Sequence, residues 1–383
     1  MKILYLIKSF AAKAGTERVM SDKMNWLSEK GCEITLVTYE QGTHPFAFPL
    51  NSSIKHYDLD TRFFELAKFN IVKRLFRYYV LRRRFRQNLQ SVMNVVKPDI
   101  FVSTTYSLHL FDVLLQIKSS SKRIIESHVA CFTVKKTEEY RSNFLLYSVF
   151  KLYDKWMLDH IRRFDGIVSL TQNDSNEWAM YSNNVYTIPN PVTFIPEKFA
   201  SVGDTHRIIC VGRLHEQKGF DLLIEAFSLI ADKCPEWVVD IYGNGDEKQT
   251  LNDLIASHNL EGRVIINSST NDIYKEYLNS SFFVLSSRYE GFGLVLLEAM
   301  SCGLPCISFD CPYGPDEIIE DGVNGFLVST FDVREMANSI LWMIENNEKR
   351  VEMGRAAKNS VARYEKNIVL QKWMKLFDSL WNN

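Results

Sequence analysis

The stretch FFVLSSRYEGFGLVLLEAM, residues 282–300, decides how the C-terminal half of the chain folds. It begins with a short apolar run, which predicts a buried strand over Phe282–Ser286. Gly291 and Gly293 follow, and glycine lets the backbone approach a ligand closely. The apolar residues after the glycines predict a helix. The stretch therefore has the strand, loop and helix order of a parallel α/β sheet.

The same strand-and-helix order recurs along both halves of the chain. Short apolar runs, many followed by an amphipathic segment, predict parallel strands covered on both faces. These runs are Ile3–Ile7, Glu33–Tyr39, Asp99–Thr105, Arg123–Ser127, Gly166–Thr171, Arg207–Gly212, Trp237–Gly243, Arg263–Asn267, Pro305–Phe309 and Gly325–Val328. We therefore predict an α/β protein of two Rossmann-like, doubly wound parallel-sheet domains, with a ligand cleft between them.

A proline-rich stretch, Tyr186–Pro196, separates the two sets of strands and predicts a connector. We expect an N-terminal domain over residues 1–190 and a C-terminal domain over 191–364. Asn367–Trp381 has apolar residues at helical spacing, so we expect a helix within 365–383 that packs back on the N-terminal domain.

The composition excludes several classes of protein. The 383 residues carry a net charge of −1, which argues against a general nucleic-acid binder. Met1–Ile7 lacks a cleavage site and reads as a buried strand, and no apolar stretch reaches about 18 residues, so we expect a cytoplasmic chain without a spanning helix. The seven cysteines are an odd number, which argues against a disulfide framework, and their spacing is not that of a zinc site, which argues against a metal site.

Two cations stand on the turn after the run Arg207–Gly212. Arg213 and Lys218 are five residues apart. The planar guanidinium of an arginine can bind two oxygens and the ammonium of a lysine acts as a point charge, so the two together suit a pyrophosphate. A solvated turn whose charges pair with nearby carboxylates would have the same sequence.

Two glutamates flank the glycine loop. Glu298 lies among apolar residues, where a carboxylate is costly unless it is paired or binds a ligand such as vicinal ribose hydroxyls. A favourable charge near the helix N-terminus is the other interpretation. Glu290 could equally be a surface loop carboxylate. The free N–H groups at the helix start favour an anion.

Together these residues resemble a known family. Glu290 and Glu298, with seven residues between them, are similar to the signature of the retaining GT-B glycosyltransferases of family 4. Further segments agree in order, and the resemblance runs from about residue 207 to 345. These segments are Gly212–Leu223, Tyr242–Gly245, Ser287–Gly293, Glu298–Pro305 and Asp321–Gly325. The resemblance implies the GT-B fold and sugar transfer from a nucleotide-sugar, without a metal or another cofactor.

The resemblance also assigns roles to individual residues. Arg213 and Lys218, after Gly212, match the basic pair on the donor pyrophosphate. Glu298 matches the glutamate on the nucleotide ribose, and Glu290 the one that contacts the transferred sugar. The backbone that meets the sugar and phosphate is that of Phe292, Gly293 and Leu294.

The N-terminal half resembles the family less fully. Gly15 and Thr16 lie in a segment similar to the family's glycine loop, where a second glycine is common and Thr16 stands instead. His128, just after the run Arg123–Ser127, matches a histidine near the transferred sugar. A histidine of purely structural role is the alternative.

The segment Asp310–Ile319 resembles a subset of these enzymes from bacterial polysaccharide pathways that use UDP-linked hexoses or N-acetylhexosamines. A tight Pro/Gly turn is the plainer interpretation. The hypothesis is a transferase acting from a UDP-sugar on a glycan or lipid-linked acceptor in polysaccharide, lipopolysaccharide or capsule synthesis. The alternatives are a non-catalytic nucleotide-sugar-binding partner and a GT-B epimerase or hydrolase. A dehydrogenase is disfavoured, because no strand precedes a convincing Gly-x-Gly-x-x-Gly.

Residues 61–90 are strongly basic, with nine Lys or Arg and one Glu among Phe, Tyr and Leu. Such a stretch can lie on an anionic leaflet, so we expect peripheral contact with the cytoplasmic face of the inner membrane. An ordinary solvated helix face is the alternative. Residues 135–163 add a second helical stretch rich in aromatics, and no nucleic-acid motif accompanies either.

Overall fold

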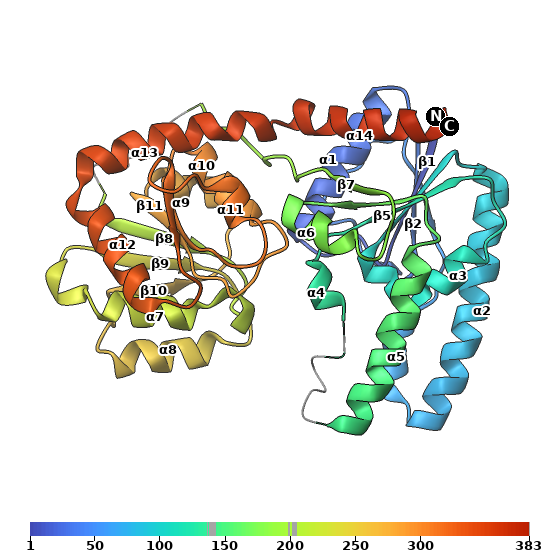
Figure 1. Cartoon of the computed structure of the whole chain (residues 1–383), viewed down its shortest axis with the longest axis horizontal. Helices are drawn as coiled ribbons and strands as arrows, with labels where there is room; N and C mark the ends of the chain where they lie inside the picture. Colours follow the sequence, from blue (N-terminus) through green and yellow to red (C-terminus); the bar gives the residue numbers. More distant parts are fainter. Residues whose placement is uncertain (136, 138–142, 198–199, 201–204, 383) are drawn as a thin grey trace. The chain divides into compact units, whose positions relative to one another are not determined.

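The computed structural model describes residues 1–383 apart from 136, 138–142, 198–199, 201–204 and 383. The chain divides into two compact units (Figure 1). Unit 1 comprises residues 1–189 and 367–383, and unit 2 comprises residues 190–366. Each unit is built around its own sheet.

The described part of unit 1 contains a seven-stranded sheet in the order β3-β2-β1-β4-β5-β6-β7, with every neighbouring pair parallel. Its strands are β1 (Lys2–Ile7), β2 (Glu33–Thr38), β3 (Lys55–Asp58), β4 (Ile100–Thr104), β5 (Lys122–Glu126), β6 (Gly166–Ser169) and β7 (Val185–Thr187). Its helices are α1 (Gly15–Glu29), η1 (Phe63–Lys68), α2 (Ile71–Val96), η2 (Thr105–Leu110), α3 (Phe111–Leu115), α4 (Cys131–Val134), α5 (Phe144–Ile161), α6 (Gln172–Trp178) and α14 (Lys366–Trp381).

Alternate residues of these strands supply two cores, one on each face of the sheet. Leu4 and Leu6 of β1 belong to the core that α2, α3 and α5 cover. Ile3 and Tyr5 belong to the opposite core, covered by α1 and α14. Figure 1 shows these two layers of helices on either side of the sheet.

The described part of unit 2 contains a six-stranded parallel sheet in the order β10-β9-β8-β11-β12-β13. Its strands are β8 (Arg207–Val211), β9 (Val238–Tyr242), β10 (Val264–Asn267), β11 (Phe282–Leu285), β12 (Cys306–Phe309) and β13 (Gly325–Val328). Its helices are η4 (Glu216–Lys218), α7 (Phe220–Ser228), η5 (Ala231–Lys233), α8 (Lys248–Ser257), α9 (Ile273–Leu278), α10 (Leu294–Ser301), α11 (Pro315–Ile318), α12 (Val333–Glu345), α13 (Asn347–Ser360) and η6 (Val361–Tyr364).

Each apolar run that predicts a strand forms one, so the α/β class and both parallel sheets are confirmed. Two edge strands, β3 and β7, are absent from the prediction. The connector prediction over Tyr186–Pro196 is wrong at its start, because Tyr186 and Thr187 pair with β6. None of the described helices is long and apolar enough to cross a membrane.

Candidate active site

The carboxyl ends of β8 and β11 lie side by side, because these strands pair directly in the sheet. The loops that follow them, 212–219 and 286–293, therefore meet. The backbone N–H of Arg288 donates to the carbonyl of Gln217 at 2.8 Å, and the Gln217 side-chain amide donates to the carbonyl of Tyr289 at 3.0 Å. These bonds tie one loop to the other.

Lys218 and Glu290 form an ion pair across the junction of these loops. Lys218 Nζ lies 2.6 Å from Glu290 Oε1, and the Ser287 hydroxyl donates to the same oxygen at 2.6 Å. Glu290 is only 6% exposed, so the pairing offsets the cost of burying its charge. The structure thus brings together two of the predicted site residues from loops 72 positions apart.

Gly219 makes this junction possible. Its φ is +61°, and a Cβ built on it would lie 2.0 Å from the Ser286 carbonyl oxygen. Gly212 has a related role, because a Cβ there would lie 3.2 Å from the Lys218 side chain. Arg213, next along the loop, is exposed, and no ion pair joins its guanidinium to another described residue.

The start of α10 closes the loop after β11. Gly293 caps this helix with φ +86°, and Phe292 before it is 3% exposed. Leu294 is the first residue of the helix. The N–H groups of a first helical turn have no partner within the helix and carry partial positive charge. The predicted anion-binding backbone therefore lies in the same loop as Glu290.

Glu298 lies one turn into α10 and is 8% exposed. It accepts a hydrogen bond from the Thr193 hydroxyl on Oε1 at 2.8 Å and one from the Tyr277 hydroxyl on Oε2 at 3.5 Å. These donors offset the burial of the carboxylate and hold its orientation. A carboxylate has about four lone-pair sites, so it can accept further hydrogen bonds from a ligand.

In unit 1, Gly15 and Thr16 begin α1, directly after the loop that follows β1. The Thr16 hydroxyl lies 3.1 Å from that of Tyr106, whose ring stacks with His128 at a centroid distance of 6.3 Å. Tyr106 thus connects two of the unit 1 residues that the sequence selects, Thr16 and His128, and Gly15 adjoins Thr16 in the chain.

Behind His128 lies a buried ion pair that the sequence analysis misses. His128 Nε2 is 3.4 Å from Glu126 Oε1, and Glu126 pairs with Lys23 of α1. The Lys23 side chain is fully buried, with its ammonium 3.8 Å from the ring centre of Trp373. Burial lowers the pKa of Lys23, and the Glu126 carboxylate opposes this shift. A signal was available, because Lys23 shares a helix face with Met20 and Leu27, where a lysine is costly unless paired.

The same surroundings set the protonation of His128. Burial lowers its pKa from 6.5 to about 4; Glu126 opposes that shift and Lys23 adds to it. As the pH falls below 6.5, His128 therefore becomes protonated in the unfolded chain while it stays neutral in the folded one. We expect this difference to lower the free energy of unfolding by roughly 3 kcal/mol between pH 6.5 and 4.

His128→Gln removes this linkage, so the difference in unfolding free energy between wild type and variant should narrow or reverse by that amount on acidification. Chemical denaturation at pH 7 and pH 4 measures it. A difference that stays constant with pH would contradict the assigned pKa.

All seven cysteines are buried and unpaired. Among the described residues, no group of three or more His, Cys, Asp or Glu side chains is arranged to hold a metal ion.

The chain resembles known proteins along its length. Residues 192–360 match the family model described as glycosyl transferases group 1. An uncharacterized glycosyltransferase of Haemophilus influenzae is 27% identical over 97% of this chain and 98% of its own. The amylovoran biosynthesis glycosyltransferase AmsD of Erwinia amylovora is 28% identical with the same coverage.

Among solved structures, a variant of TarM from S. aureus superposes with a TM-score of 0.75 at 18% identity, covering 98% of this chain and 99% of TarM. That structure is described as a complex with Fondaparinux, alpha-GlcNAc-glycerol and UDP. The superposition concerns the fold, while the family match covers the loops that hold Lys218 and Glu290 and the helix α10 that holds Glu298. The chain is therefore a GT-B glycosyltransferase, in which residues 192–360 match the group 1 family model.

Proposed function

We propose that this enzyme transfers a hexose or N-acetylhexosamine, with retention of anomeric configuration, from a UDP-sugar to a glycan or lipid-linked acceptor in cell-surface polysaccharide synthesis. The observation that carries the proposal is the Lys218–Glu290 pair at the junction of two loops, beside the start of α10. The UDP in the TarM complex and the amylovoran pathway of AmsD support the donor class and the setting.

The geometry suggests how the positive charge is used. An ammonium group has three N–H bonds that can donate. Lys218 donates one of them to Glu290, which leaves the others for oxygens of the UDP-sugar diphosphate. Arg213, exposed at the start of the same loop, and the first N–H groups of α10 would add to this charge. Stabilising the leaving diphosphate in this way lowers the barrier to breaking the sugar–phosphate bond.

The remaining residues would orient the donor. Glu298, held by Thr193 and Tyr277, would accept hydrogen bonds from the ribose hydroxyls. Glu290 would contact the transferred sugar, as the backbone of Phe292 and Gly293 would. In unit 1, Gly15, Thr16 and His128 would meet the sugar and acceptor. The acceptor oxygen would attack on the face that the diphosphate leaves, so no side chain need become covalently attached.

A screen of nucleotide diphosphates and UDP-sugars by thermal shift tests the donor class. Stabilisation by UDP and one UDP-sugar, but not by other nucleotides, is the expected result. NMR of the reaction product then reports the anomeric configuration of the new linkage. An inverted product, or a preference for another nucleotide, would refute the corresponding part of the proposal.

The proposal also holds that no metal ion is required, because side chains and backbone supply the charge at the diphosphate. We expect turnover after exhaustive treatment with EDTA to equal that of untreated enzyme within a factor of about two. A catalytic metal would stabilise the transition state by several kcal/mol, so its removal would cause a far larger loss. Activity lost to EDTA and restored by Mg²⁺ or Mn²⁺ would show the opposite.

We also propose that the enzyme works at the cytoplasmic face of the inner membrane, in peripheral contact through residues 61–90. The structure places most of this basic segment in η1 and α2 of unit 1.

A further inference from the structure

Two long helices of unit 1 extend past the core that they cover. The buried residues of α2 are Phe85, Leu89 and Met93, all in its C-terminal half. Among the described residues of α5, the buried ones lie between Asp154 and Ile161, also the C-terminal half. The N-terminal halves of both helices therefore contribute no fully buried side chain among the described residues, and only the half-buried Tyr78 and Leu81 of α2 pack against the core from that half.

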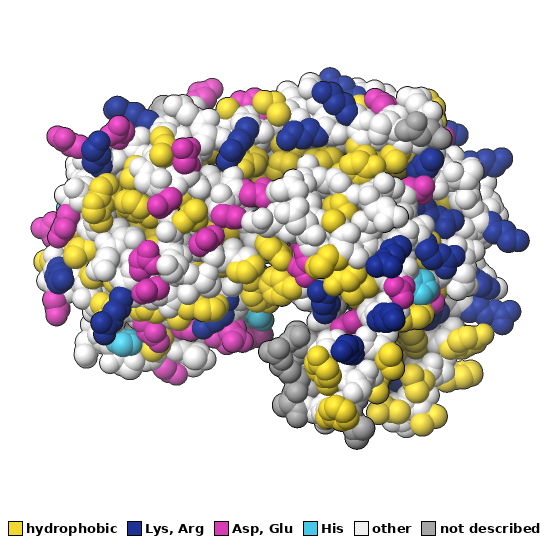
Figure 2. All heavy atoms as spheres, viewed as in Figure 1, with side chains coloured by type: hydrophobic (Ala, Val, Ile, Leu, Met, Phe, Trp, Pro, Cys, Tyr) yellow, Lys and Arg dark blue, Asp and Glu magenta, His cyan; other side chains and the backbone are white. Residues whose placement is uncertain are grey.

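These uncovered halves are nevertheless rich in large apolar side chains. Val72 is 78% exposed, Phe76 70%, Phe144 80% and Leu152 70%. Apart from Val95 near the end of α2, the exposed large apolar side chains among the described residues of η1, α2 and α5 are Phe64, Ile71, Val72, Leu75, Phe76, Tyr79, Val80, Phe144, Leu146, Val149, Leu152 and Trp156. Figure 2 shows apolar side chains gathered where these two helices begin, away from the sheet. We call this set the apolar tip. Exposed apolar surface of this extent marks an interaction site.

The charges around the apolar tip select the partner. Residues 61–90 carry nine Lys or Arg and one Glu. Three of these cations pair with carboxylates: Arg82 with Asp112, and Arg62 and Arg84 with Asp60. Apolar side chains surrounded by excess positive charge are the features that insert into, and are attracted to, a leaflet containing anionic lipids.

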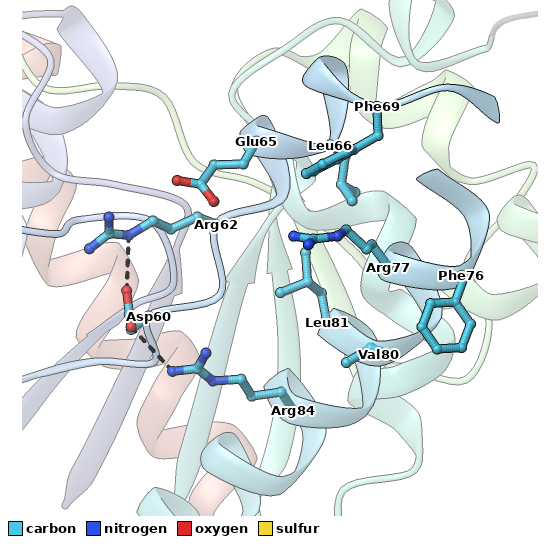
Figure 3. A pocket seen from close by; sticks show the side chains of 10 residues that line it. All are labelled: Asp60, Arg62, Glu65, Leu66, Phe69, Phe76, Arg77, Val80, Leu81 and Arg84. Atoms are coloured by element: carbon cyan, nitrogen blue, oxygen red, sulfur yellow. Dashed lines mark hydrogen bonds and ion pairs between the residues drawn. The ribbon is translucent and has the colours of Figure 1, made fainter. Parts of the chain in front are cut away.

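A pocket of ≈ 510 Å³ lies against the apolar tip, between η1 and α2 (Figure 3). Asp60 holds two guanidinium groups at its rim, with Arg62 Nε at 2.9 Å and Arg84 Nη2 at 3.2 Å. A guanidinium has five N–H donors, so both arginines keep donors for a ligand. Arg77 stacks on the Phe69 ring at 4.2 Å and points into the same space.

Glu65 also lines the pocket, and the rest of its wall is apolar. The apolar part contains Leu66, Leu81 and two members of the apolar tip, Phe76 and Val80. Val72, Phe76 and Val80 are spaced four residues apart, so they form one stripe along α2 that leads into the pocket. A molecule with an anionic head and an apolar tail could contact the guanidinium groups with its head and the apolar stripe with its tail at the same time. A soluble glycan would account for the pocket but not for the stripe.

We propose that the N-terminal halves of α2 and α5 dock the enzyme on the membrane, and that the pocket between η1 and α2 holds the phosphate-bearing headgroup of an anionic lipid. This deepens the membrane contact in the proposed function and is independent of donor binding in unit 2. Arg62, Arg77 and Arg84 bind the headgroup, while the apolar tip enters the leaflet.

Sedimentation of the full chain with vesicles tests both parts. Wild type should bind vesicles of phosphatidylcholine with phosphatidylglycerol and not vesicles of phosphatidylcholine alone. Arg77→Ala with Arg84→Ala should lose at least about tenfold more affinity than the matched pair Arg83→Ala with Arg86→Ala, which removes equal charge from the same helix. Equal losses in both pairs would mean diffuse attraction and would overturn the pocket.

A second variant tests the apolar tip. Phe144→Ser with Leu152→Ser keeps every charge and should weaken binding to anionic vesicles at least about tenfold, because each side chain loses apolar area that the leaflet would bury. Unchanged binding would remove α5 from the docking surface. If vesicles fail to bind wild type while a neutral oligosaccharide stabilises it through Arg77 and Arg84, the pocket is a glycan site and the proposal is wrong.

The stabilisation of each variant by UDP serves as the readout for unit 2. We expect it to equal that of wild type, because all four substituted arginines and both apolar residues lie in unit 1. Loss of vesicle binding with an intact UDP response would support the lipid site, whatever the donor sugar proves to be. A wild type that binds vesicles but no nucleotide would refute the proposed donor and leave the docking surface in place.

Discussion

Lys218→Ala is expected to reduce transfer from the UDP-sugar by at least about a hundredfold, which is the usual effect of removing one group that stabilises charge in a transition state. The ammonium lies 2.6 Å from Glu290 and is the cation that the loop after β8 presents at the junction. Removing it takes charge from the diphosphate and leaves a buried carboxylate without its counter-ion. Steady-state kinetics with the donor varied would show the loss mainly in kcat.

Lys275→Ala is the matched control, because it breaks an ion pair of similar length on an exposed helix of the same unit, with Asp272 at 2.8 Å. We expect it to retain full activity, since exposed pairs of this kind contribute little. Glu290→Gln provides the complementary variant, which keeps the size of the side chain and removes its charge. If Lys218→Ala and Lys275→Ala had the same turnover, the assignment of the diphosphate site would fail.

Gly219→Ala is expected to destabilise unit 2 by more than about 4 kcal/mol, the range that only a few mechanisms of single-residue damage reach. A methyl group there would lie 2.0 Å from the Ser286 carbonyl oxygen, which is backbone and cannot rotate away. The loops after β8 and β11 would have to separate, and Lys218 and Glu290 with them. Thermal unfolding and the shift caused by UDP measure both losses.

Gly262→Ala separates collision from backbone strain. Gly262 also has a positive φ, +76°, but a Cβ there would meet nothing within 4 Å. It should lose only the about 1 kcal/mol that alanine forfeits in the left-handed region. Similar melting temperatures for the two variants would show that the loops can part without cost.

Much of the fold could be predicted from the sequence, because buried parallel strands are apolar along their whole length. Ile3–Ile7 and Phe282–Ser286 are unmistakable for this reason. β3 and β7 escape the prediction because edge strands are buried less: Lys55 and His56 are exposed, and β7 is half-buried throughout. An edge strand is specified by its neighbour's unpaired backbone more than by its own side chains.

The site divides in the same way. Lys218, Glu290 and Glu298 could be found because they follow strands and glycines in an order that the sequence displays. Tyr106 and Glu126 could not, because their importance lies in what folding brings to them from distant positions: Thr16 to one, Lys23 to the other. The residues of the apolar tip lie in the basic segment 61–90 and the aromatic-rich stretch 135–163, but the sequence does not say which of their apolar side chains the core leaves uncovered.

The division of unit 1 into residues 1–189 and 367–383 has a consequence for biosynthesis. On the ribosome, all of unit 2 emerges before α14 does. Until then the nascent face made by Tyr5, Met20 and Met24 lacks Trp373 and Phe377, with which it shares a core in the finished enzyme. Lys23 also lacks the nearer of its two aromatic rings, that of Trp373. Unit 1, which is translated first, is thus completed last. During that interval its uncovered apolar face is a surface that a chaperone would bind.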